Sequence, residues 1–355
     1  MIPAVSNPAE DWWSTLVADV PGLDAILLGL AFVIAWAVAR AATPGLIQAA
    51  TRFGIVDRPD GQLKNHEQPV PYLGGLAVAL GVLVSLGLTY RFDKQLLAVL
   101  LSSSIVLVIG LLDDLGSMTP GRKLVGQLLA VLVLVKAGVM IQLVFLPLWV
   151  TVPLSVLWLL AAINAFNLID IMDGLSSGVG AVAAAFFAGI AFFAGMSDTA
   201  FLGAALAGGL LGFRRYNVAP ARIYLGDTGS MFAGLLLGAL AMVNEYTMVH
   251  RFGAVVPLLI LGVPLFDMLF VMYVRRRRGL PVMLGSPDHV ALRLRKWRLS
   301  TRSTVRVNVA VSAVLGAAGT AVMLLPLAWA GALVAVLVGI AVVLAAWLHT
   351  IDMGL

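Results

Sequence analysis

The sequence contains no cysteine and few charged residues. Cysteine is absent from all 355 residues, which excludes disulfide bonds, thiolate metal sites and a cysteine nucleophile. Charged residues make up 12% of the chain, about half the share found in an ordinary soluble domain. Hydrophobic residues make up 61%, so the chain has too little polar surface to face water on all sides. These deficits indicate an integral membrane protein.

Long apolar runs are present instead, without the alternation that is typical of a transmembrane β-barrel. About 20 apolar residues cross the hydrocarbon core as a helix, in which the backbone polar groups pair internally. We therefore predict an all-α, polytopic integral membrane protein with about 10–11 transmembrane helices, forming one domain over residues 1–355. The eleven apolar segments lie near 23–42, 72–90, 95–112, 123–141, 149–166, 178–196, 199–213, 230–247, 253–274, 305–326 and 328–349.

Positive charge is divided unevenly between the two ends of these segments. All but four of the 23 Lys and Arg residues fall on one side, and the positive-inside rule makes that side cytoplasmic. The net charge of +5 therefore reflects membrane topology, and we expect no nucleic-acid partner. Eight aspartates fall on the same side: Asp57, Asp60, Asp113, Asp114, Asp170, Asp173, Asp227 and Asp288. This convergence is expected of a site that handles a metal and a phosphorylated substrate at the membrane surface.

Two adjacent carboxylates, Asp113 and Asp114, end the third apolar segment, and Lys123 and Gln127 follow at the start of the next. Neighbouring carboxylates repel each other unless a cation or a proton relieves them. The pair could hold a divalent metal or orient a nucleophile. A solvated turn at the membrane surface explains the pair equally well.

The sequence NAFNLIDIMDGLSSG places two amides and two carboxylates at intervals of three residues: Asn164, Asn167, Asp170 and Asp173. In a helix this spacing puts them near one face, and such a polar stripe at the end of a transmembrane helix is costly unless it has a purpose. The amides could bind a nucleobase or a sugar, and the carboxylates a metal. The alternative is a polar cap that runs into a loop, because Asp173-Gly174 is typical of a helix end.

The sequence GDTGS, residues 226–230, predicts a tight loop that opens a helix. Free backbone N–H groups at a helix start suit phosphate, and Asp227 there could bind magnesium, which favours carboxylates and phosphate oxygens. The alternative is a turn in which Asp227 or Thr228 caps the helix.

Residues 275–304 form a long basic loop that we expect to contribute to sugar-nucleotide binding. The four arginines that open it are most simply explained as a positive flank. His289 and Arg293 are better candidates for contacting a diphosphate, since guanidinium groups grip phosphate in bidentate fashion. Asp267 lies about 12 Å of helix inside the cytoplasmic end, a depth at which an acid is a site candidate.

These blocks, in this order, resemble the polyprenyl-phosphate N-acetylhexosamine-1-phosphate transferases, of the glycosyltransferase family 4 type. The resemblance runs from GIVDRPDGQLKNH through LLDDLGS, GRKLVGQ, NAFNLIDIMDGL, YNVAPARIYLGDTGS and VPLFDMLFV to HVALRL, over about residues 54–295. The span count most closely resembles the bacterial undecaprenyl-phosphate GlcNAc-1-phosphate transferase branch.

The resemblance implies a magnesium (or manganese) site built from the aspartates. Asp113 and Asp114 would lie at the polyprenyl phosphate, Asp227 would ligate the metal, and Asp170 and Asp173 would serve the metal or the nucleotide. All five are predicted catalytic residues. The predicted substrate-binding residues are Lys64, His66, Lys123, Asn164, Asn167, Asn217, Asp267, His289 and Arg293.

Two positions depart from the family pattern. Ile171 stands where the family usually has glycine. The loop that usually reads HxHH followed by Arg-Leu retains only His289 and Arg293, with Ala291 and Leu292 in place of histidines. The peptidoglycan translocase of the family carries a histidine triplet there, so we predict that this chain is not that enzyme.

The function implied is transfer of a sugar-1-phosphate from a UDP-sugar, such as UDP-GlcNAc, to undecaprenyl or polyprenyl phosphate, with release of UMP, at the start of a lipid-linked cell-envelope glycan. The implied location is the bacterial plasma membrane with cytoplasmic catalytic loops, and a homodimer is an analogy to the family. A catalytically weakened scaffold and a secondary transporter are the alternatives. A transporter would carry its acids near the bilayer midplane in related halves, whereas most acids here lie at one face.

Overall fold

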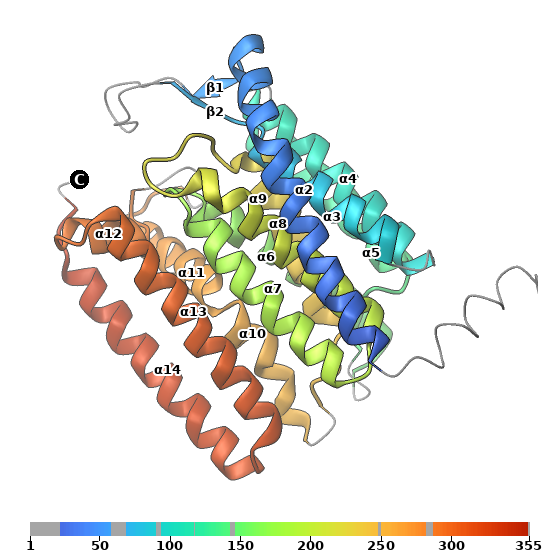
Figure 1. Ribbon diagram of the computed structural model, residues 1–355. Coiled ribbons are helices and arrows are strands. Elements are labelled where there is room, and N and C mark those ends of the chain that lie inside the picture. The colour runs from blue at the N-terminus through green and yellow to red at the C-terminus, as the bar shows by residue number, and fades with distance from the viewer. Residues whose placement is uncertain are drawn as a thin grey trace, which may run out of the picture.

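The computed structural model describes residues 22–57, 69–89, 94–116, 118–142, 146–247, 250–281 and 287–353. They form a bundle of long helices (Figure 1). The helices are α2 (Leu23–Phe53), α3 (Gly74–Thr89), α4 (Lys94–Asp114), α5 (Pro120–Lys136), α6 (Leu148–Ile169), α7 (Leu175–Phe193), α8 (Ser197–Asn217), α9 (Gly226–Val243), η1 (Arg251–Val255), α10 (Val256–Ile260), α11 (Gly262–Arg277), α12 (Val290–Lys296), α13 (Thr301–Leu324) and α14 (Leu327–Thr350).

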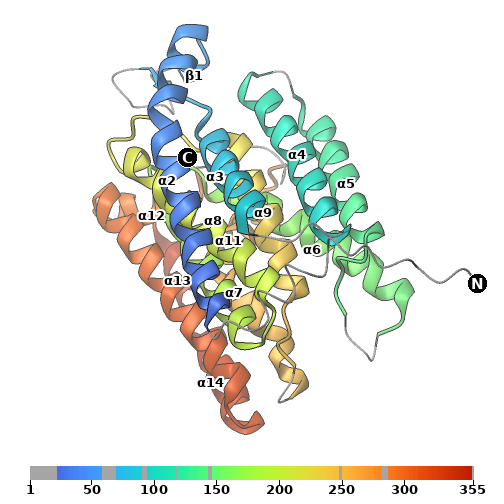
Figure 2. The same cartoon turned by 45° about the vertical axis from the view of Figure 1, so that its right-hand side comes forward.

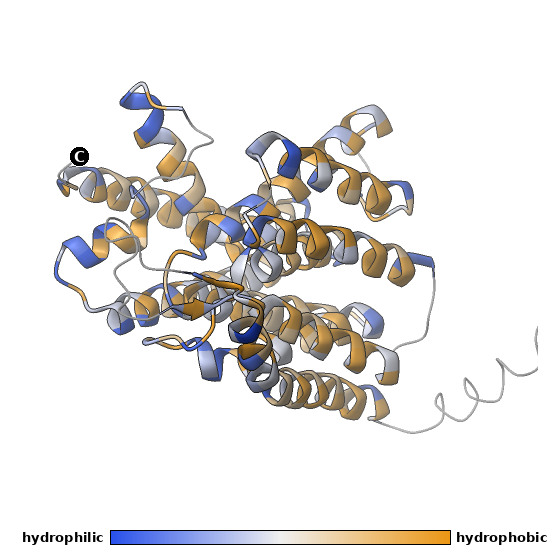
Figure 3. Cartoon of the chain, turned by 90° about the horizontal axis from the view of Figure 1, so that it is seen from above, coloured by the Kyte–Doolittle hydropathy of each residue, from blue (hydrophilic) through white to orange (hydrophobic). Residues whose placement is uncertain are grey.

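The predicted all-α, polytopic class is confirmed, because each predicted apolar segment coincides with a helix or a bent pair of helices. Among the described residues, seven helices are long and apolar enough to cross a membrane, or eight if the bent pair is one span. Hydrophobic residues run along the helices and hydrophilic residues gather at their ends (Figure 3). The higher count of 10–11 spans stays a prediction, since it also needs α3, α5 and α8.

The first helix is longer than predicted. The apolar segment ends near residue 42, but α2 continues to Phe53, through Pro44. Gly54 ends the helix in the left-handed conformation, with φ 71°, and its N–H bonds back to the carbonyls of Ala50 and Thr51. A glycine at this position relieves the unpaired carbonyls of a helix end at little steric cost. The polar stretch that follows the first apolar segment is therefore partly helical.

The predicted span 253–274 is two helices rather than one. α10 and α11 meet at Leu261 with a bend of 76° across the break. Pro264 in the first turn of α11 has no N–H to continue the hydrogen-bond ladder of α10. The sequence therefore breaks the span within the apolar run, where hydropathy alone gives no signal.

A short hairpin follows α2. β1 (Val56–Asp57) pairs antiparallel with β2 (Val70–Pro71), with Val56 opposite Pro71. Tyr224 donates its backbone N–H to the carbonyl of Pro71 at 2.9 Å. The hairpin is thus tied to the segment that leads into α9.

Helix α9 occupies the centre of the bundle. It packs against α3, α4, α6, α7 and α8, and nearly all of its side chains are buried. By contrast α14 buries only Ala330 and Leu348, and it lies at the periphery (Figure 2). The residues in the first turn of α9 are therefore fixed in place by packing against several neighbouring helices.

Candidate active site

Three helices bring oxygen atoms around the ammonium group of Lys123, which is on α5. It lies 2.7 Å from Oδ2 of Asp113 on α4 and 2.9 Å from Oδ1 of Asn167 on α6, and it also contacts Oδ2 of Asp227 on α9. The three acidic and basic side chains are only partly exposed, at 15% for Lys123, 21% for Asp113 and 31% for Asp227. We call these four residues the Lys123 cluster. These contacts bring the predicted site residues Asp113, Lys123 and Asp227 together in space.

The amides of α6 hold the cluster from one side. Asn167 donates from Nδ2 to Oδ1 of Asp227 at 2.8 Å and to Oγ of Ser230 at 3.1 Å. One turn earlier, Asn164 donates to Oε1 of Gln127 at 2.8 Å. Gln127 is fully buried. It was not predicted as a site residue, although it lies one turn after Lys123. Asn167 therefore contacts the acids directly, whereas Asn164 supports the packing of α6 on α5.

The two adjacent aspartates face different partners. Asp113 pairs with Lys123, while Asp114 accepts hydrogen bonds from the backbone N–H groups of Asp227 and Thr228. The predicted loop–helix opening at Gly226 is confirmed, but its cap comes from Asp114 of α4 rather than from Asp227 or Thr228. Sequence spacing could not reveal this, because the contact joins residues 113 positions apart.

Asp170 and Asp173 lie beyond the end of α6, which stops at Ile169. Asp170 accepts a hydrogen bond from the backbone of Gly226, and burial, with Asp227 and Asp114 nearby, raises its pKa well above the usual aspartate value. Asp173 accepts the backbone N–H of Ala221 at 2.9 Å. The three-residue spacing thus continues through a turn rather than along a helix. Of the two aspartates, Asp170 is the one whose pKa is raised by Asp227 of the Lys123 cluster. Gly174 leads into α7 instead of ending a helix.

Asp57, Tyr72 and Tyr224 lie near the site aspartates and were not among the predicted site residues. Asp57 of β1 accepts a hydrogen bond from Tyr72, and the rings of Tyr72 and Tyr224 lie 6.0 Å apart. Burial first, and then this hydrogen bond, raises the pKa of Tyr72, while burial and Asp173 raise the pKa of Tyr224 to about 12. Both phenols therefore keep their protons at neutral pH and can donate hydrogen bonds. In the sequence, only Asp57 in GIVDRPD indicated that this segment could belong to the site.

Asn217, the last residue of α8, is buried and bonds within the protein. Its Oδ1 accepts from the N–H of Gly174 and from Oγ of Ser177, and its Nδ2 donates to the carbonyl of Ile223, each at 3.0 Å. These bonds join the start of α7 to the segment before Asp227. Asn217 therefore braces the site, and its predicted contact with substrate stays a prediction.

Asp267 and His289 form a buried pair at the start of α12. His289 Nδ1 lies 2.6 Å from Oδ2 of Asp267, whose Oδ1 accepts the backbone N–H of Val290 at 2.7 Å. The pair fixes the orientation of the imidazole. Binding of substrate by either residue stays a prediction.

Arg293 faces the protein interior. Its guanidinium donates to Oδ1 of Asp288 at 2.6 Å and to the carbonyls of Leu348 and Ile351 at 2.9 and 2.8 Å, and it lies 5.3 Å from the centroid of Phe270. Only 1% of its surface is exposed. In this arrangement Arg293 locks α12 to the end of α14 and has no surface with which to grip a diphosphate, so the expected contact would require these bonds to break.

The departures from the histidine pattern have a packing explanation. Ala291 is buried in the main hydrophobic core, and Leu292 packs against its edge. Both side chains therefore contribute to the attachment of α12 rather than to a polar surface. Lys64 and His66, two further predicted binding residues, lie outside the described residues.

The fit of the site to magnesium can be judged from its donor atoms. The described residues contain no group of three or more His, Cys, Asp or Glu side chains placed to hold a metal ion. The Lys123 ammonium nevertheless stands among two carboxylates and an amide oxygen, which are the hard oxygen donors that magnesium prefers. The donor atoms are therefore of the type that magnesium prefers, although the protein would supply few of its ligands.

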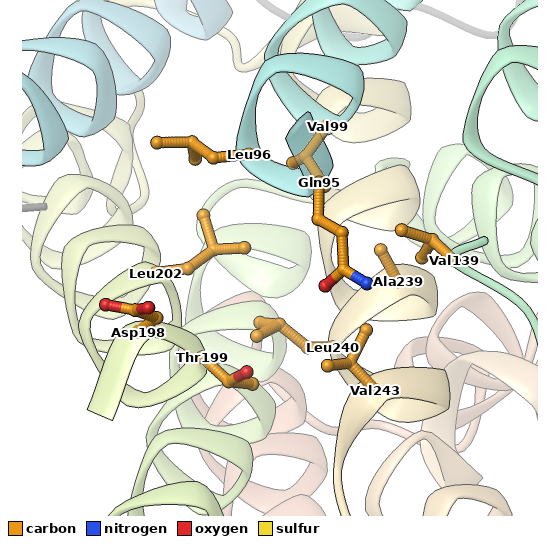
Figure 4. Close-up of a pocket in the computed structure, with 10 residues that line it drawn as sticks. All are labelled: Gln95, Leu96, Val99, Val139, Asp198, Thr199, Leu202, Ala239, Leu240 and Val243. Carbon is orange, nitrogen blue, oxygen red and sulfur yellow. The ribbon is translucent and has the colours of Figure 1, made fainter. Parts of the chain in front are cut away.

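A separate small cavity of about 40 Å³ lies at the other ends of the same helices. It is lined by Gln95, Leu96, Val99, Val139, Asp198, Thr199, Leu202, Ala239, Leu240 and Val243 (Figure 4). Gln95 is at the start of α4 and Asp113 near its end, so about 27 Å of helix separates the cavity from the acids. The cavity is therefore not part of the candidate site.

Comparison with known proteins places the cluster inside a recognised family. Residues 96–245 match the family described as Glycosyl transferase family 4. All four residues of the Lys123 cluster fall within this range. The match therefore covers the helices α4 to α9 that build the site.

Curated relatives cover most of the chain. One is a probable undecaprenyl-phosphate N-acetylglucosaminyl 1-phosphate transferase of Bacillus subtilis, 32% identical over 79% of this chain and 81% of the relative. Another is a decaprenyl-phosphate N-acetylglucosaminephosphotransferase of Mycolicibacterium smegmatis, 30% identical over 78% and 76%. A phospho-N-acetylmuramoyl-pentapeptide-transferase of Halalkalibacterium halodurans is 32% identical over 69% and 82%.

The Bacillus and Halalkalibacterium relatives are each 32% identical to this chain, so identity does not separate the two kinds of enzyme that they represent. The predicted resemblance is confirmed by the family match and by the extent of these alignments. Because the family match contains the whole Lys123 cluster and the Bacillus relative aligns with most of the chain, this protein belongs to glycosyl transferase family 4.

Proposed function

We propose that this protein transfers N-acetylglucosamine-1-phosphate, or a related N-acetylhexosamine-1-phosphate, from a UDP-sugar to undecaprenyl or another polyprenyl phosphate. The reaction takes place at the cytoplasmic face of a bacterial plasma membrane and starts a lipid-linked envelope glycan. The Lys123 cluster carries the proposal, because it combines acids, an amide and a cation at one end of a membrane bundle. The names of the Bacillus and Mycolicibacterium relatives support the same acceptor and sugar.

The reaction is a direct phosphoryl transfer. An oxygen of the lipid phosphate attacks the β-phosphorus of the UDP-sugar, the bond from that phosphorus to the bridging oxygen breaks, and UMP leaves with the electron pair. The product is polyprenyl diphosphate-sugar. Positioning and charge stabilisation supply nearly all catalysis in such a transfer.

Asp113 and Lys123 are placed to act on the phosphates. The second pKa of a phosphate monoester is near 6, so the lipid phosphate is mostly dianionic at neutral pH and needs little help from a general base. We therefore assign Asp113 to positioning the acceptor through Lys123, whose ammonium lies 2.7 Å away. Lys123 can exchange a carboxylate partner for a phosphate oxygen without losing charge compensation.

We assign magnesium, or manganese, to Asp227, with Asn167 and Asp170 as further oxygen donors close to it. Magnesium commonly uses one or two carboxylates and completes its shell with substrate phosphates and water, which suits a site with few protein ligands. When bound, the cation supplies neutralisation of the charge on the diphosphate. Asp173 is less suited, because it is engaged by the backbone of Ala221.

The alternatives explain less. A scaffold has no need of a lysine held by two carboxylates from different helices. A transporter would place its acids near the midplane, whereas Asp113 and Asp227 stand at the end of α4 and the start of α9.

The test uses purified protein, undecaprenyl phosphate and a panel of UDP-sugars labelled in the uridine, with and without magnesium. We expect UMP release from UDP-GlcNAc that requires both lipid and magnesium and that is lost in Asp227→Asn. A folded protein that releases no UMP from any donor, or an Asp227→Asn variant with full turnover, would refute the proposal. A panel donor other than UDP-GlcNAc would redefine the sugar alone.

A further inference from the structure

The first turn of α9 has no cap of its own. Leu225 precedes the helix in a helical conformation, and its side chain offers no hydrogen-bond acceptor. The first N–H groups of a helix have no partner within the helix and must find one elsewhere. Asp170 accepts the backbone N–H of Gly226, so the N–H groups of Asp227 and Thr228 are the ones that still need a partner.

Asp114 supplies it from the end of α4. Its Oδ1 accepts the N–H of Asp227 at 2.8 Å, and its Oδ2 accepts the N–H of Thr228 at 3.1 Å and the hydroxyl of Thr228 at 2.6 Å. An ionised carboxylate only accepts hydrogen bonds and has about four lone-pair sites. Three of these are used by the first turn of α9, and a carboxylate at a helix N-terminus also interacts favourably with the helix dipole.

Two glycines let this carboxylate approach. Gly226 has φ 71°, and a Cβ on it would stand 2.6 Å from Oδ2 of Asp114. One turn before Asp114, a Cβ on Gly110 would stand 2.5 Å from the carbonyl oxygen of Asp227. The end of α4 and the start of α9 are thus in contact along their backbones, at a separation that only glycine permits.

Asp113 does something different, although it is the adjacent residue. Its carboxylate pairs with Lys123, which also holds the side chain of Asp227. Asp113 therefore faces the open part of the site, and Asp114 faces the backbone that carries Asp227.

We propose that Asp114 is a positioning residue that fixes the start of α9, and through it the Asp227 carboxylate, and that it contacts neither the lipid phosphate nor the sugar nucleotide. The proposal rests on the proposed function for its kinetic consequences only. It divides the aspartate pair into Asp113, which acts toward substrate, and Asp114, which acts through the backbone.

The substitution Asp114→Asn tests this division, because it keeps the size of the side chain and replaces one acceptor oxygen by an N–H donor. That donor meets the backbone N–H of Asp227 or of Thr228 instead of an acceptor. Asp113→Asn is the matched control, since it makes the same chemical change one residue away. Thr228→Val is a milder variant that removes only the 2.6 Å hydroxyl contact.

The first measurement is hydrogen–deuterium exchange of the backbone over residues 225–230 in the full-length protein. Asp114→Asn should speed exchange there by about tenfold or more, because the N–H groups of Asp227 and Thr228 lose their acceptors. Asp113→Asn should leave it within about twofold. Unchanged exchange in Asp114→Asn would overturn the proposal, and so would an equal effect of Asp113→Asn.

The second measurement separates KM from kcat. Asp114→Asn should lower kcat by about tenfold or more and leave KM for undecaprenyl phosphate within about twofold, since a displaced Asp227 affects turnover rather than acceptor binding. A raised KM for the lipid with unchanged kcat would show contact with the acceptor and overturn the proposal. If Asp114→Asn does not fold, Thr228→Val carries the test and should show the same pattern to a smaller degree, and normal kcat and exchange in it would count against the proposal.

Failure of the proposed function gives a different result. If the wild-type protein releases no UMP, the kinetic measurement has no signal, but the exchange comparison between Asp114→Asn and Asp113→Asn still decides whether Asp114 holds α9.

Discussion

The ammonium group of Lys123 lies 2.7 Å from Oδ2 of Asp113 and also contacts Asp227, so one lysine neutralises two carboxylates from α4 and α9 that also interact with each other. Without it, the two acids would face each other in a partly buried site. Like charges at such separations strongly disfavour ionisation of both groups. Lys123 is therefore needed both for the shape of the site and for its charge.

We expect Lys123→Met to lower UMP release by about 100-fold or more, because it removes the charge that pairs with Asp113 and Asp227. Arg122→Met is the matched control, since it removes an exposed cation one residue earlier. The measurement is the rate of UMP release with UDP-GlcNAc and undecaprenyl phosphate. Activity of Lys123→Met within about twofold of the control would contradict the assignment.

Asp170 gives a prediction about pH. Its pKa is raised by burial and by Asp227 and Asp114, so the folded state binds this proton more tightly than the unfolded state. Stability is then favoured below the usual aspartate pKa and is lost as pH rises through the raised value. In metal-free buffer at pH 7, Asp170→Asn should melt at a higher temperature than the wild type.

That difference should shrink as pH falls toward 4, where the wild-type carboxyl is protonated. Added magnesium should raise the melting temperature of the wild type more than that of Asp170→Asn. The measurement is thermal unfolding in detergent with chelator and with magnesium. A lower melting temperature for Asp170→Asn in chelator at pH 7 would be the opposite of this expectation.

Arg293 gives a prediction about stability. Arg293→Met leaves the buried Asp288 with the partly exposed Arg278 as its remaining cation. Breaking a buried ion pair costs up to about 3–5 kcal/mol, so Arg293→Met should unfold at a clearly lower temperature. Arg295→Met, an exposed residue on the same helix, is the control and should change the unfolding temperature little. Equal melting temperatures for the two variants would show that the Asp288 contact is not made.

The start of α9 gives a prediction about backbone geometry. Gly226→Ala puts a Cβ on a residue with φ 71°, 2.6 Å from Oδ2 of Asp114. The left-handed conformation alone costs about 1–2 kcal/mol for a residue with a Cβ, and the contact adds to it. We expect a lower melting temperature and loss of most UMP release.

Gly121→Ala is its control, because nothing lies within 4 Å of a Cβ there. Alanine in a helix is favoured over glycine by roughly 0.5–1 kcal/mol, so this variant should be at least as stable as the wild type. Similar losses in both variants would remove the steric argument.

The sequence predicts the long helices well, because each contains an apolar run whose length is set by the membrane, whereas the short basic helix α12 lies within a predicted loop. It is less informative where one contact overrides hydropathy, as at Pro264, which bends the span 253–274, and at Gly54, which ends α2 eleven residues beyond the apolar run. The hairpin of β1 and β2 depends on pairing with a segment near Tyr224. Such a long-range partner is not visible in local pattern.

The site shows the same division. The grouping of Asp113, Lys123, Asn167 and Asp227 was predictable from residue type and from the shared side of the membrane. The role of Arg293 was not, because an arginine in a basic loop has the same sequence signal whether it faces phosphate or the buried carboxylate of Asp288. Asp57 and Gln127 were noted in the sequence but not predicted as site residues, and Tyr72 was not singled out, because the contacts of each depend on a neighbour supplied by another element.

The two aspartates also acquire their partners at different times during synthesis. Lys123 follows Asp113 by ten residues, so this pair can form as soon as α4 and α5 have entered the membrane. The partners of Asp114 lie 113 and 114 residues later, which at about 5–20 residues per second is a delay on the order of 10 seconds. During that interval the carboxylate of Asp114 lacks the backbone N–H groups of Asp227 and Thr228 to which it later bonds. Completion of the catalytic centre is thus a late event in biogenesis, and a chain released before α9 emerges contains Asp113, Lys123 and Asn167 but lacks Asp227.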